Sequence, residues 1–481
     1  MRAEAIRRTI AACGALAALV AAGGCGSDGP TGAYGVRVGI SYVGAVQREA
    51  PENVLAVPVL YLALGADSVR VVYAPAGGAE ERTPVRPATD VEDTVVLLGL
   101  QPSTTYQYRL EAFAGPEKIE SSTQTFTTAA LPPELAAVQL QRLGGGTSQY
   151  ALTTARARYA VAFDSTGAIA WYHDFGSLLV SDAQRQPNGD YTVYAGTTAG
   201  WNAVDGYYVE ITPAGDVVRE WHAPAGEYAD NHDIRVTGTG ADAQAEFFTY
   251  TIRTTDLTPL GGLPNVALAG HDLVRMDAAG NVLFRWSGWD NIAPSEWVGD
   301  EDAKTTRTAT DFDHPNSLSL DAAGNYVVSW RNLDQVMGMD PRTGQVLWRV
   351  GGAKSDYTFV GDPDGGFRKQ HSAKMLPNGD LLVYDNGTGH SPQETRAAEY
   401  RLDPVAKTAT LVWQYRHSPA IWTQYVGWTE RLGNGDTWVA FALQGRVVQV
   451  NPAGETVWEA QLKVDGTDAS VYRIIPLASL T

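Results

Sequence analysis

Hydrophobic and polar residues alternate along most of the chain in short runs that end at turn residues. Between residues 34 and 130 the alternation is carried by "VRVGISYV", "SVRVVYAP", "DTVVLLGL" and "YQYRLEAFA". Period-two alternation over about four to eight residues indicates half-buried β-strands. No long segment has the period of an amphipathic helix. The pattern therefore predicts an all-β protein.

A repeated unit occupies the chain from about residue 135 onward. Each copy is a polar turn, usually with glycine, followed by a strand that contains tryptophan. The copies are "FDSTGAIAWYHD" from Phe163, "ITPAGDVVREWHA" from Ile211, "MDAAGNVLFRWSG" from Met276, "MDPRTGQVLWRVGG" from Met339, "LDPVAKTATLVWQY" from Leu402 and "VNPAGETVWEAQL" from Val450. They begin about 48 to 65 residues apart, which suits a four-stranded blade. Six copies predict a six-bladed β-propeller over residues 135–481.

A second hairpin precedes most of these copies. Its examples are "SDAQRQPNGDYTVYAG", "HPNSLSLDAAGNYVVSWR", "HSAKMLPNGDLLVYDN" and "WTERLGNGDTWVAFA". Asn-Gly, as at residues 378–379, is a strong hairpin signal. We expect these hairpins to be the inner halves of the blades, with the first strand lining a central channel. The C-terminal "VYRIIPLASL" is expected to close the ring against strands around residues 137–152.

Residues 34–130 are predicted to form a separate β-sandwich, because their short strands have sandwich spacing. The segment "LGLQPSTTYQYRLEAF" resembles the fibronectin type III pattern, with counterparts at Leu100, Pro102, Thr105, Tyr106 and Tyr108. It contains no residues typical of catalysis, so a spacer or docking role is expected. The Pro-Pro break in "TAALPPELAA" ends this domain.

The first 24 residues have the pattern of an export signal. Three arginines precede an apolar run from Thr9 to Ala22, which is too short to span a bilayer. Ala22-Gly23-Gly24 before Cys25 resembles a bacterial lipoprotein cleavage site, with cleavage of an ordinary signal peptide as the alternative. We expect an exported protein of the cell envelope, lipid-anchored at Cys25, with residues 25–33 as a flexible linker.

Composition and net charge limit the kinds of partner that the protein can bind. The 481 residues are 44% hydrophobic, enough for more than one core. The leader's three arginines and one glutamate carry +2, so its removal changes the net charge from −18 to −20. This charge argues against nucleic acid and against adsorption to anionic lipid, so the anchor is the expected membrane contact. Only one cysteine would remain, which excludes an intramolecular disulfide.

Three histidines fall at equivalent points of the repeats. His314 and His371 each begin a predicted inner strand, and His232 begins that of an earlier blade. Equivalent positions on different blades point at one axis, so three imidazoles are expected at one mouth of the channel. Strand pairing about a turn at Ala322-Ala323 places Arg331 opposite His314, and pairing about Asn378-Gly379 places Asn386 opposite His371. Asn316 is expected on the same strand face as His314.

The propeller sequence resembles the bacterial arylsulfate sulfotransferases. The resemblance is carried by "NHDI", "HPNSL", "VVSWRNLDQV", "RKQHSAKMLPNGDLLVYDNG" and "VYRIIPL". It implies sulfuryl transfer from an aryl sulfate to a phenol without a cofactor or an adenosine-phosphosulfate donor. It further implies that His371 is the nucleophile, that His232, His314 and Arg331 are catalytic, and that Asn316 binds substrate. Asn386, from the register argument, is a further candidate for substrate binding.

The chemistry of these residue types suits the reaction. A neutral imidazole can displace a phenolate from sulfur and form an N-sulfohistidine, which divides the transfer into two steps. Arginine offers a planar set of donors to sulfuryl oxygens. The other two histidines can exchange protons with phenol oxygens. No metal is required.

Two other functions remain open at this level. The three histidines could instead hold zinc in a metal-dependent hydrolase, or the chain could be a non-catalytic binding scaffold at the cell surface. "GGAKS" at 351–355 lacks the spacing of a phosphate-binding loop, and "DPDGG" at 362–366 is interpreted as a turn rather than a calcium loop. His271 is expected to be structural.

Overall fold

The computed structural model describes residues 38–46, 53–198, 205–299 and 309–480. The predicted export signal, Cys25 and most of the linker lie outside the described residues. Within them the all-β prediction is confirmed, because the chain forms eight β-sheets. The helical segments are single turns: α2 Pro133–Ala136, α3 Gly288–Asn291, η2 Gly240–Asp242, η3 Thr258–Leu260, η4 Pro294–Glu296, η6 Arg331–Leu333 and η7 Ala442–Gln444. None of the helices in these ranges is long and apolar enough to cross a bilayer.

Two sheets make up the N-terminal part of the described chain. The first has the order β1-β2-β6, and the second has β4-β3-β7-β8 with β5 on β3 and β9 on β7. Their bounds are β1 Gly39–Ala45, β2 Val57–Leu64, β3 Ser68–Pro75, β4 Glu81–Arg82, β5 Arg86–Pro87, β6 Asp93–Leu97, β7 Thr105–Ala114, β8 Glu117–Glu120 and β9 Gln124–Thr127. Alternate side chains of β2 are buried, as the period-two pattern predicts. Val59 and Tyr61 of one sheet share a hydrophobic core with Val71 and Leu110 of the other.

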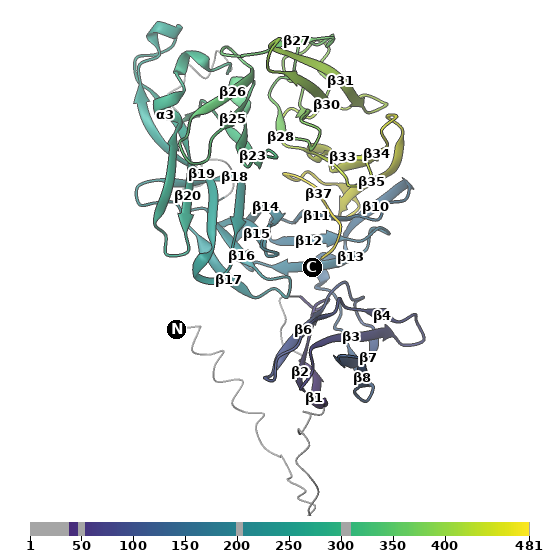
Figure 1. Cartoon of the computed structure of the whole chain (residues 1–481). Helices are drawn as coiled ribbons and strands as arrows, with labels where there is room; N and C mark the ends of the chain where they lie inside the picture. Colours follow the sequence, from purple (N-terminus) through teal and green to yellow (C-terminus); the bar gives the residue numbers. More distant parts are fainter. Residues whose placement is uncertain (1–37, 47–52, 199–204, 300–308, 481) are drawn as a thin grey trace, which may run out of the picture.

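Six further sheets follow along the chain and lie around a common centre, with β14, β23, β28 and β37 innermost (Figure 1). From the innermost strand outward they are β37-β11-β12-β13, β14-β15-β16-β17, β18-β19-β20-β21, β23-β24-β25-β26, β28-β29-β30-β31 and β32-β33-β34-β35-β10. Short strands β22, β27 and β36 add to three of them.

The strand bounds of these sheets are as follows. The first three sheets contain β11 Tyr150–Ala155, β12 Tyr159–Phe163, β13 Ile169–Asp174, β14 Leu179–Arg185, β15 Tyr191–Gly196, β16 Tyr207–Ile211, β17 Val217–Trp221, β18 Tyr228–Thr237, β19 Gln244–Thr255, β20 Val266–Asp277, β21 Val282–Ser287 and β22 Thr310–Asp311, together with β37 Ile475–Leu477. The other three contain β10 Val138–Gly145, β23 Pro315–Leu320, β24 Tyr326–Trp330, β25 Gln335–Met339, β26 Val346–Gly351, β27 Thr358–Val360, β28 His371–Met375, β29 Leu381–Asp385, β30 Arg396–Asp403, β31 Thr408–Arg416, β32 Trp428–Arg431, β33 Thr437–Phe441, β34 Arg446–Val450, β35 Thr456–Val464 and β36 Thr467–Asp468.

The repeated tryptophan lies on the strand after the polar turn, and it connects neighbouring sheets. Trp171 of β13 stacks on Tyr191 of the next sheet, with ring centroids 4.4 Å apart. Its indole N–H donates to the carbonyl of Pro213, in the turn of that sheet, at 2.8 Å. Trp413 of β31 makes the same kind of bond to Pro452 at 3.2 Å. A large aromatic ring that packs between neighbouring sheets explains why tryptophan recurs at this point of the repeat. The indole N–H is bonded in Trp171 and Trp413, whereas those of Trp286 and Trp458 have no hydrogen-bond partner among the described residues.

The C-terminal strand closes the set of sheets. β37 pairs antiparallel with β11, and Tyr150 is the partner of Leu477. This pairing confirms the predicted closure against residues in the 137–152 region. β10 instead adds an outermost strand to the last sheet, through pairing with β35. The first of the six sheets therefore contains the last strand of the chain, β37, and the last sheet contains β10, which precedes all the other strands of these sheets.

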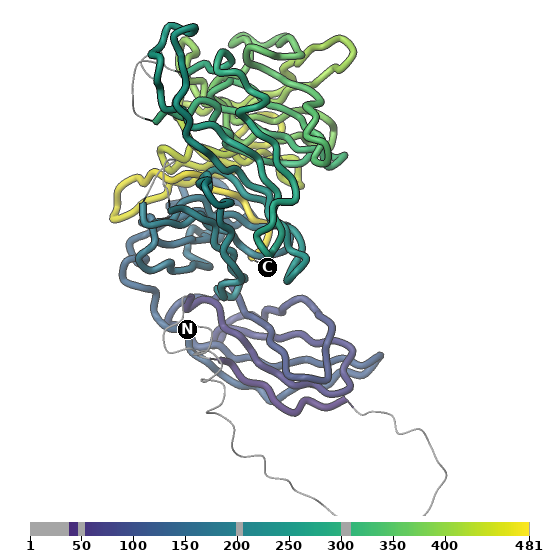
Figure 2. Tube along the Cα trace, turned by 90° about the vertical axis from the view of Figure 1, so that its left-hand side faces the viewer, coloured from purple at the N-terminus to yellow at the C-terminus, as the bar shows by residue number. Residues whose placement is uncertain are grey.

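The N-terminal sheets contact the first of the six sheets (Figure 2). Leu55 is fully buried in a core that it shares with Tyr159 and Tyr172 of that sheet. The backbone N–H of Val54 donates to the hydroxyl of Tyr172 at 3.1 Å. The contact is on the outer side of the ring, away from its centre.

Candidate active site

The three candidate histidines lie at or near the start of innermost strands. His232 is in β18, His314 immediately precedes β23, and His371 is the first residue of β28. The pairing of each strand with its neighbour is irregular there, with register shifts at Ala229/Ile234, Pro315/Ser317 and His371/Lys374. His314 and Ser372 also have positive φ values of 51° and 49°. Such bulges and strained residues re-aim side chains and concentrate at functional sites.

These histidines come together with Arg331. The rings of His232 and His314 lie with centroids 4.4 Å apart. The backbone N–H of Arg331 donates to the carbonyl of His314 at 2.9 Å. The positive charge of Arg331 acts on the imidazole of His371, and His314 and His232 are also near enough to influence it. The fold therefore gathers four residues from three sheets into one cluster.

His371 is held in a single tautomer. It is 2% exposed, and its Nδ1 lies 2.6 Å from Oδ1 of Asn386. The amide nitrogen of Asn386 donates to the carbonyls of Thr423 and Val426 at 2.8 and 3.0 Å, so its oxygen accepts from His371. The proton is therefore on Nδ1 and the lone pair on Nε2. Burial, followed by the positive charge of Arg331, lowers the pKa of His371 well below its usual value, so the ring is neutral.

The other two imidazoles are each oriented by a carboxylate. Nδ1 of His232 lies 2.8 Å from Oδ1 of Asp230, and Nδ1 of His314 lies 2.5 Å from Oδ2 of Asp311. Burial lowers the pKa of His314 to about 4, although Asp311 acts in the opposite direction. Nε2 of each ring is thus the atom available to exchange a proton with a substrate oxygen.

The two orienting aspartates were not identified from the sequence. Both precede the histidine that they hold, in "DNH" and "DFDH", by two and three residues. A carboxylate this close in sequence to a candidate catalytic histidine is the signal that could have indicated them. His271 was assigned a structural role, and it lies fully buried directly behind this pair of aspartates.

Arg331 is fixed from two sides. It opens the turn η6, where Nη1 donates to Oδ1 of Asn332 at 2.9 Å and Nη2 donates to the carbonyl of Gln424 at 3.1 Å. The predicted register was correct here, because Pro315 pairs with Trp330 and His314 bonds to Arg331. A guanidinium held in one plane can present paired donors to an anionic group.

The register predicted for the next hairpin was wrong. His371 pairs with Tyr384, not with Asn386. Next to the turn, Lys374 already pairs with Leu382, one residue off the predicted register, and the bulge between His371 and Lys374 adds a second shift. The side chain of Asn386 nevertheless reaches His371 from beyond the end of β29. Its role in the structure is to orient the imidazole.

Asn316 is buried next to the start of β28, the strand that begins with His371. Its Nδ2 donates to the carbonyl of Gln370 at 2.8 Å, directly before His371. The bulge between Pro315 and Ser317 interrupts the alternation that placed Asn316 on the face of His314. Oδ1 of Asn316 is buried without a hydrogen-bond partner among the described residues.

The C-terminal segment also reaches the cluster. The guanidinium of Arg473 donates to the carbonyl of His232, and its Nε lies 2.9 Å from Oδ1 of Asp182. The ring of Tyr472 lies 5.6 Å from that of His232, centroid to centroid. Residues just before β37 thus support His232 from behind.

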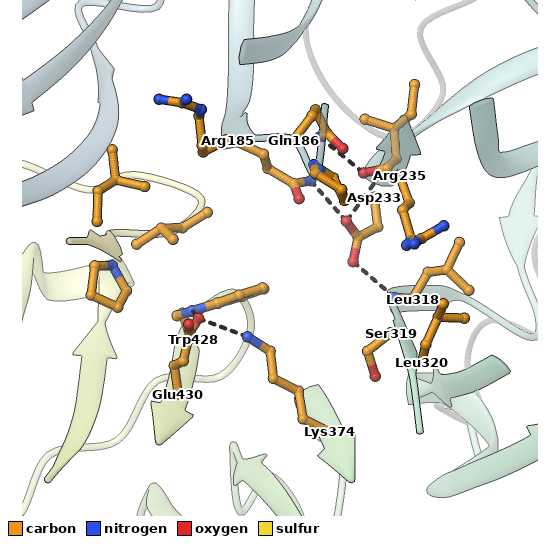
Figure 3. A pocket seen from close by; sticks show the side chains of 16 residues that line it. Arg185, Gln186, Asp233, Arg235, Leu318, Ser319, Leu320, Lys374, Trp428 and Glu430 are labelled. Atoms are coloured by element: carbon orange, nitrogen blue, oxygen red, sulfur yellow. Dashed lines mark hydrogen bonds and ion pairs between the residues drawn. The ribbon is translucent and has the colours of Figure 1, made fainter. Parts of the chain in front are cut away.

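A cavity of about 480 Å³ lies among the later parts of the innermost strands (Figure 3). Lys374 and Glu430 face each other across part of it at 2.7 Å, and Asp233 bonds to the backbone of Leu318 at 2.8 Å. Lys374 and Glu430 therefore neutralise each other, whereas Asp233 accepts from a backbone N–H group. Lys374 is three residues beyond His371, so the cavity and the histidine cluster lie toward opposite ends of the same strands.

Two groups of described residues have the spacing of metal ligands. They are His271 with Asp311 and Asp313, and Asp364 with Asp385 and His390. The trio of His232, His314 and His371, which the hydrolase alternative requires, is not among the groups of described residues whose ligand atoms lie this close. In the second group, Arg396 already contacts Asp364 at 3.3 Å and Asp385 at 2.9 Å. The turn interpretation of "DPDGG" agrees with this pairing, since Asp362 also binds Arg396.

The arrangement defines a class of site: a neutral, buried imidazole beside a guanidinium and two imidazoles that are each oriented by a carboxylate. A family model described as "Arylsulfotransferase (ASST)" matches residues 208–463, which include all four of these residues. The chain belongs to the arylsulfotransferase family. Membership indicates a sulfotransferase, with small-molecule aryl sulfates and phenols as the substrates that the family implies.

Comparison with curated proteins gave no match. Among solved structures, the chain is similar to a protein of unknown function from Bacteroides caccae, at 15% identity over 69% of this chain and 100% of that chain, with a TM-score of 0.41. It is also similar to a streptogramin B lyase, at 11% identity over 70% of this chain and 92% of that chain, with a TM-score of 0.37. TM-scores this low support no argument about activity.

Proposed function

We propose that the protein transfers a sulfuryl group from an aryl sulfate to a phenol through a sulfohistidine on His371. The observation that carries this proposal is the neutral, buried imidazole whose Nδ1 is bound to Asn386. A neutral Nε2 is the form of histidine that can act as a nucleophile. Burial protects the resulting N–S bond from water.

The bonds and protons balance over two half-reactions. In the first, the lone pair of Nε2 of His371 forms a bond to sulfur, and the sulfur–oxygen bond to the aryl group breaks with its electrons leaving on the phenolate. In the second, a phenol oxygen attacks sulfur, the N–S bond breaks, and the phenol proton passes to Nε2 of His314 or His232. That proton can then be delivered to the next phenolate. Neither half-reaction needs a cofactor.

Arg331 stabilises the charge on the sulfuryl group. Its guanidinium is held by Asn332 and Gln424, so it loses little conformational freedom when substrate binds. The net charge of −18 repels an anionic substrate at long range. Because salt screens charges beyond about 8 Å at physiological ionic strength, the local cation can still attract it.

We propose that the six sheets of residues 138–477 are the blades of a six-bladed β-propeller, and that the two N-terminal sheets are a fibronectin type III-like sandwich. The supporting observation is the order of strands in each sheet. We further propose export to the cell envelope and lipid attachment at Cys25, on the sequence of the leader. The domain limits are then 1–24, 25–33, 34–130 and 135–481.

Rapid mixing with a chromogenic aryl sulfate tests the mechanism. Donor alone should release about one equivalent of phenol per site in a burst, and intact-protein mass spectrometry should find one added sulfuryl group, labile in acid, on His371. Steady-state lines should be parallel across acceptor concentrations. His371→Asn should abolish the burst and the adduct, whereas His222→Asn, on an exposed histidine, should keep both. A burst that persists in His371→Asn would exclude this nucleophile.

A further inference from the structure

His271 lies behind the histidine cluster and contacts the carboxylates that orient it. It is fully buried in β20. Its Nδ1 lies 2.6 Å from Oδ1 of Asp313, and its backbone N–H donates to Oδ2 of the same residue at 3.0 Å. Its Nε2 lies 3.4 Å from Oδ2 of Asp230, which is an ion-pair distance. Both ring nitrogens therefore face carboxylate oxygens, which is the environment of a doubly protonated imidazolium.

The same carboxylates hold the two proton-exchanging histidines. Asp230 uses Oδ1 for His232 and presents Oδ2 to His271. Asp311 uses Oδ2 for His314, and its Oδ1 lies 3.7 Å from Nδ1 of His271. One buried ring thus stands behind both orienting carboxylates.

The charges around His271 require a cation at its position. Asp230, Asp311 and Asp313 are all at least nine-tenths buried, and buried carboxylates need a counter-charge. Burial alone would lower the pKa of His271, but Asp313 and Asp311 raise it well above its usual value. The titratable and charged groups that act on this cluster from the surrounding elements are His232, His314, Arg331 and Tyr250.

We propose that His271, as an imidazolium, is the positioning residue that aligns Asp230 and Asp311 and thereby aims His232 and His314 at the phenol oxygens. The inference rests on the proposed sulfuryl transfer. His271 does not touch the substrate; it acts through the two carboxylates. The single positive charge of His271 acts on the carboxylates that hold His232 and His314, which belong to different sheets.

Replacement of His271 by Asn tests this role, because the Asn amide keeps a donor toward Asp313 but removes the charge. We expect kcat to fall about 10- to 100-fold, with the KM for the donor changed less than about two-fold. Loss of the imidazolium removes a positive charge near His314, so the pKa of His314 should rise. The acid limb of the acceptor-dependent rate should therefore move to higher pH. The matched control is His173→Asn, a buried histidine of the first of the six sheets.

The outcomes separate this inference from the proposed function. If the wild-type protein turns over no aryl sulfate, the proposed function itself is wrong. Wild-type kcat and an unshifted pH profile in His271→Asn would overturn the role of His271 alone. So would one equivalent of tightly bound metal in wild-type protein that is lost in the variant, since His271, Asp311 and Asp313 would then be ligands. If the variant fails to fold, NMR of the wild-type ring decides: neutral His271 at pH 7 would overturn the proposal.

Discussion

His371 and Asn386 are joined by a 2.6 Å hydrogen bond, although the strand register places Tyr384 and not Asn386 opposite the histidine. The amide reaches back from the residue after β29, and its own N–H groups are used by Thr423 and Val426. A short bond from a neutral acceptor fixes the tautomer without adding charge. The bond itself acts to raise the pKa of His371, but burial and then the positive charge of Arg331 lower it well below its usual value, so the imidazole stays neutral.

Replacing Asn386 by Asp should convert His371 into a pH-dependent nucleophile. The new carboxylate beside Nδ1 favours the protonated ring and so raises the pKa of His371. We expect the burst rate of the variant at pH 5.5 to be at least about 10-fold below its rate at pH 8. The wild-type burst should change less over the same range, because burial and Arg331 hold the pKa of His371 well below its usual value. Stopped-flow measurement of phenol release at each pH checks this, and equal pH profiles would contradict it.

Replacing Arg331 by Lys should slow transfer although the charge is kept. A lysine offers one centre of charge in place of two aligned donors, and loss of one such contact costs about 10²-fold in kcat. The measurement is steady-state transfer from aryl sulfate to phenol. Arg342→Lys, at a side chain that is 83% exposed, is the control. A wild-type rate in Arg331→Lys would remove Arg331 from the site.

The pH dependence of the second half-reaction should report His314. Its pKa is about 4, so its Nε2 is unprotonated and able to accept the phenol proton above that pH. The acceptor-dependent rate should therefore stay level from pH 8 to about 5 and fall below about 4, where the ring becomes protonated. Circular dichroism at each pH shows whether the fold persists. A midpoint near 6.5, the value of an unperturbed histidine, would contradict the assignment.

Removing the charge of Arg396 should destabilise the protein strongly. This side chain is fully buried and pairs with Asp362 at 2.8 Å and Asp385 at 2.9 Å, both fully buried as well. Arg396→Met leaves these carboxylates unpaired, at a cost of about 3–5 kcal/mol in the free energy of unfolding. Urea denaturation measures the loss. Arg401→Met, at a side chain 66% exposed, should change stability little. Equal urea midpoints for the two variants would show that Asp362 and Asp385 do not depend on Arg396 for their counter-charge.

Cys25 should determine membrane attachment. A diacylated cysteine supplies more than one chain, which stable anchoring requires. In cell fractionation, Cys25→Ser should move the protein from the membrane to the soluble fraction. Cys13→Ser, within the leader, should leave it attached. An unchanged membrane fraction for Cys25→Ser would show that no lipid is carried there.

The repeats made much of the fold predictable, because each hairpin is a local feature of the sequence. The copies that begin at Phe163 and Val450, for example, are the strand pairs β12-β13, at the outer edge of its sheet, and β34-β35, which β10 covers on the outside. The predicted pairing of His314 with Arg331 is found, although Leu320 pairs with Tyr326 next to the turn, one residue off the predicted register, and the bulge between Pro315 and Ser317 restores it. The His371 register was wrong, because its pairing next to the turn is also one residue off and a bulge at a left-handed serine, which the sequence does not mark, adds to the shift.

The orienting groups were harder to predict for a different reason. Asp230, Asp311 and His271 lie on three different strands of one sheet, β18, β22 and β20, and only the folding of that sheet brings them together. No periodicity along the chain encodes such a contact. A search for aspartate within three residues before each candidate histidine would have found Asp230 and Asp311, together with Asp313, but not His271.

The support that Arg473 gives to His232 links catalysis to chain synthesis. Arg473 lies more than 200 residues after His232, and the strand that follows it holds the ring closed against β11. While the chain is still emerging from the ribosome or passing through a membrane pore, His232 lacks this support and the sheets are not joined. We therefore expect the proposed sulfuryl transfer to begin only after the C-terminal strand has joined the first of the six sheets. An exported form would reach its destination without having consumed any donor on the way.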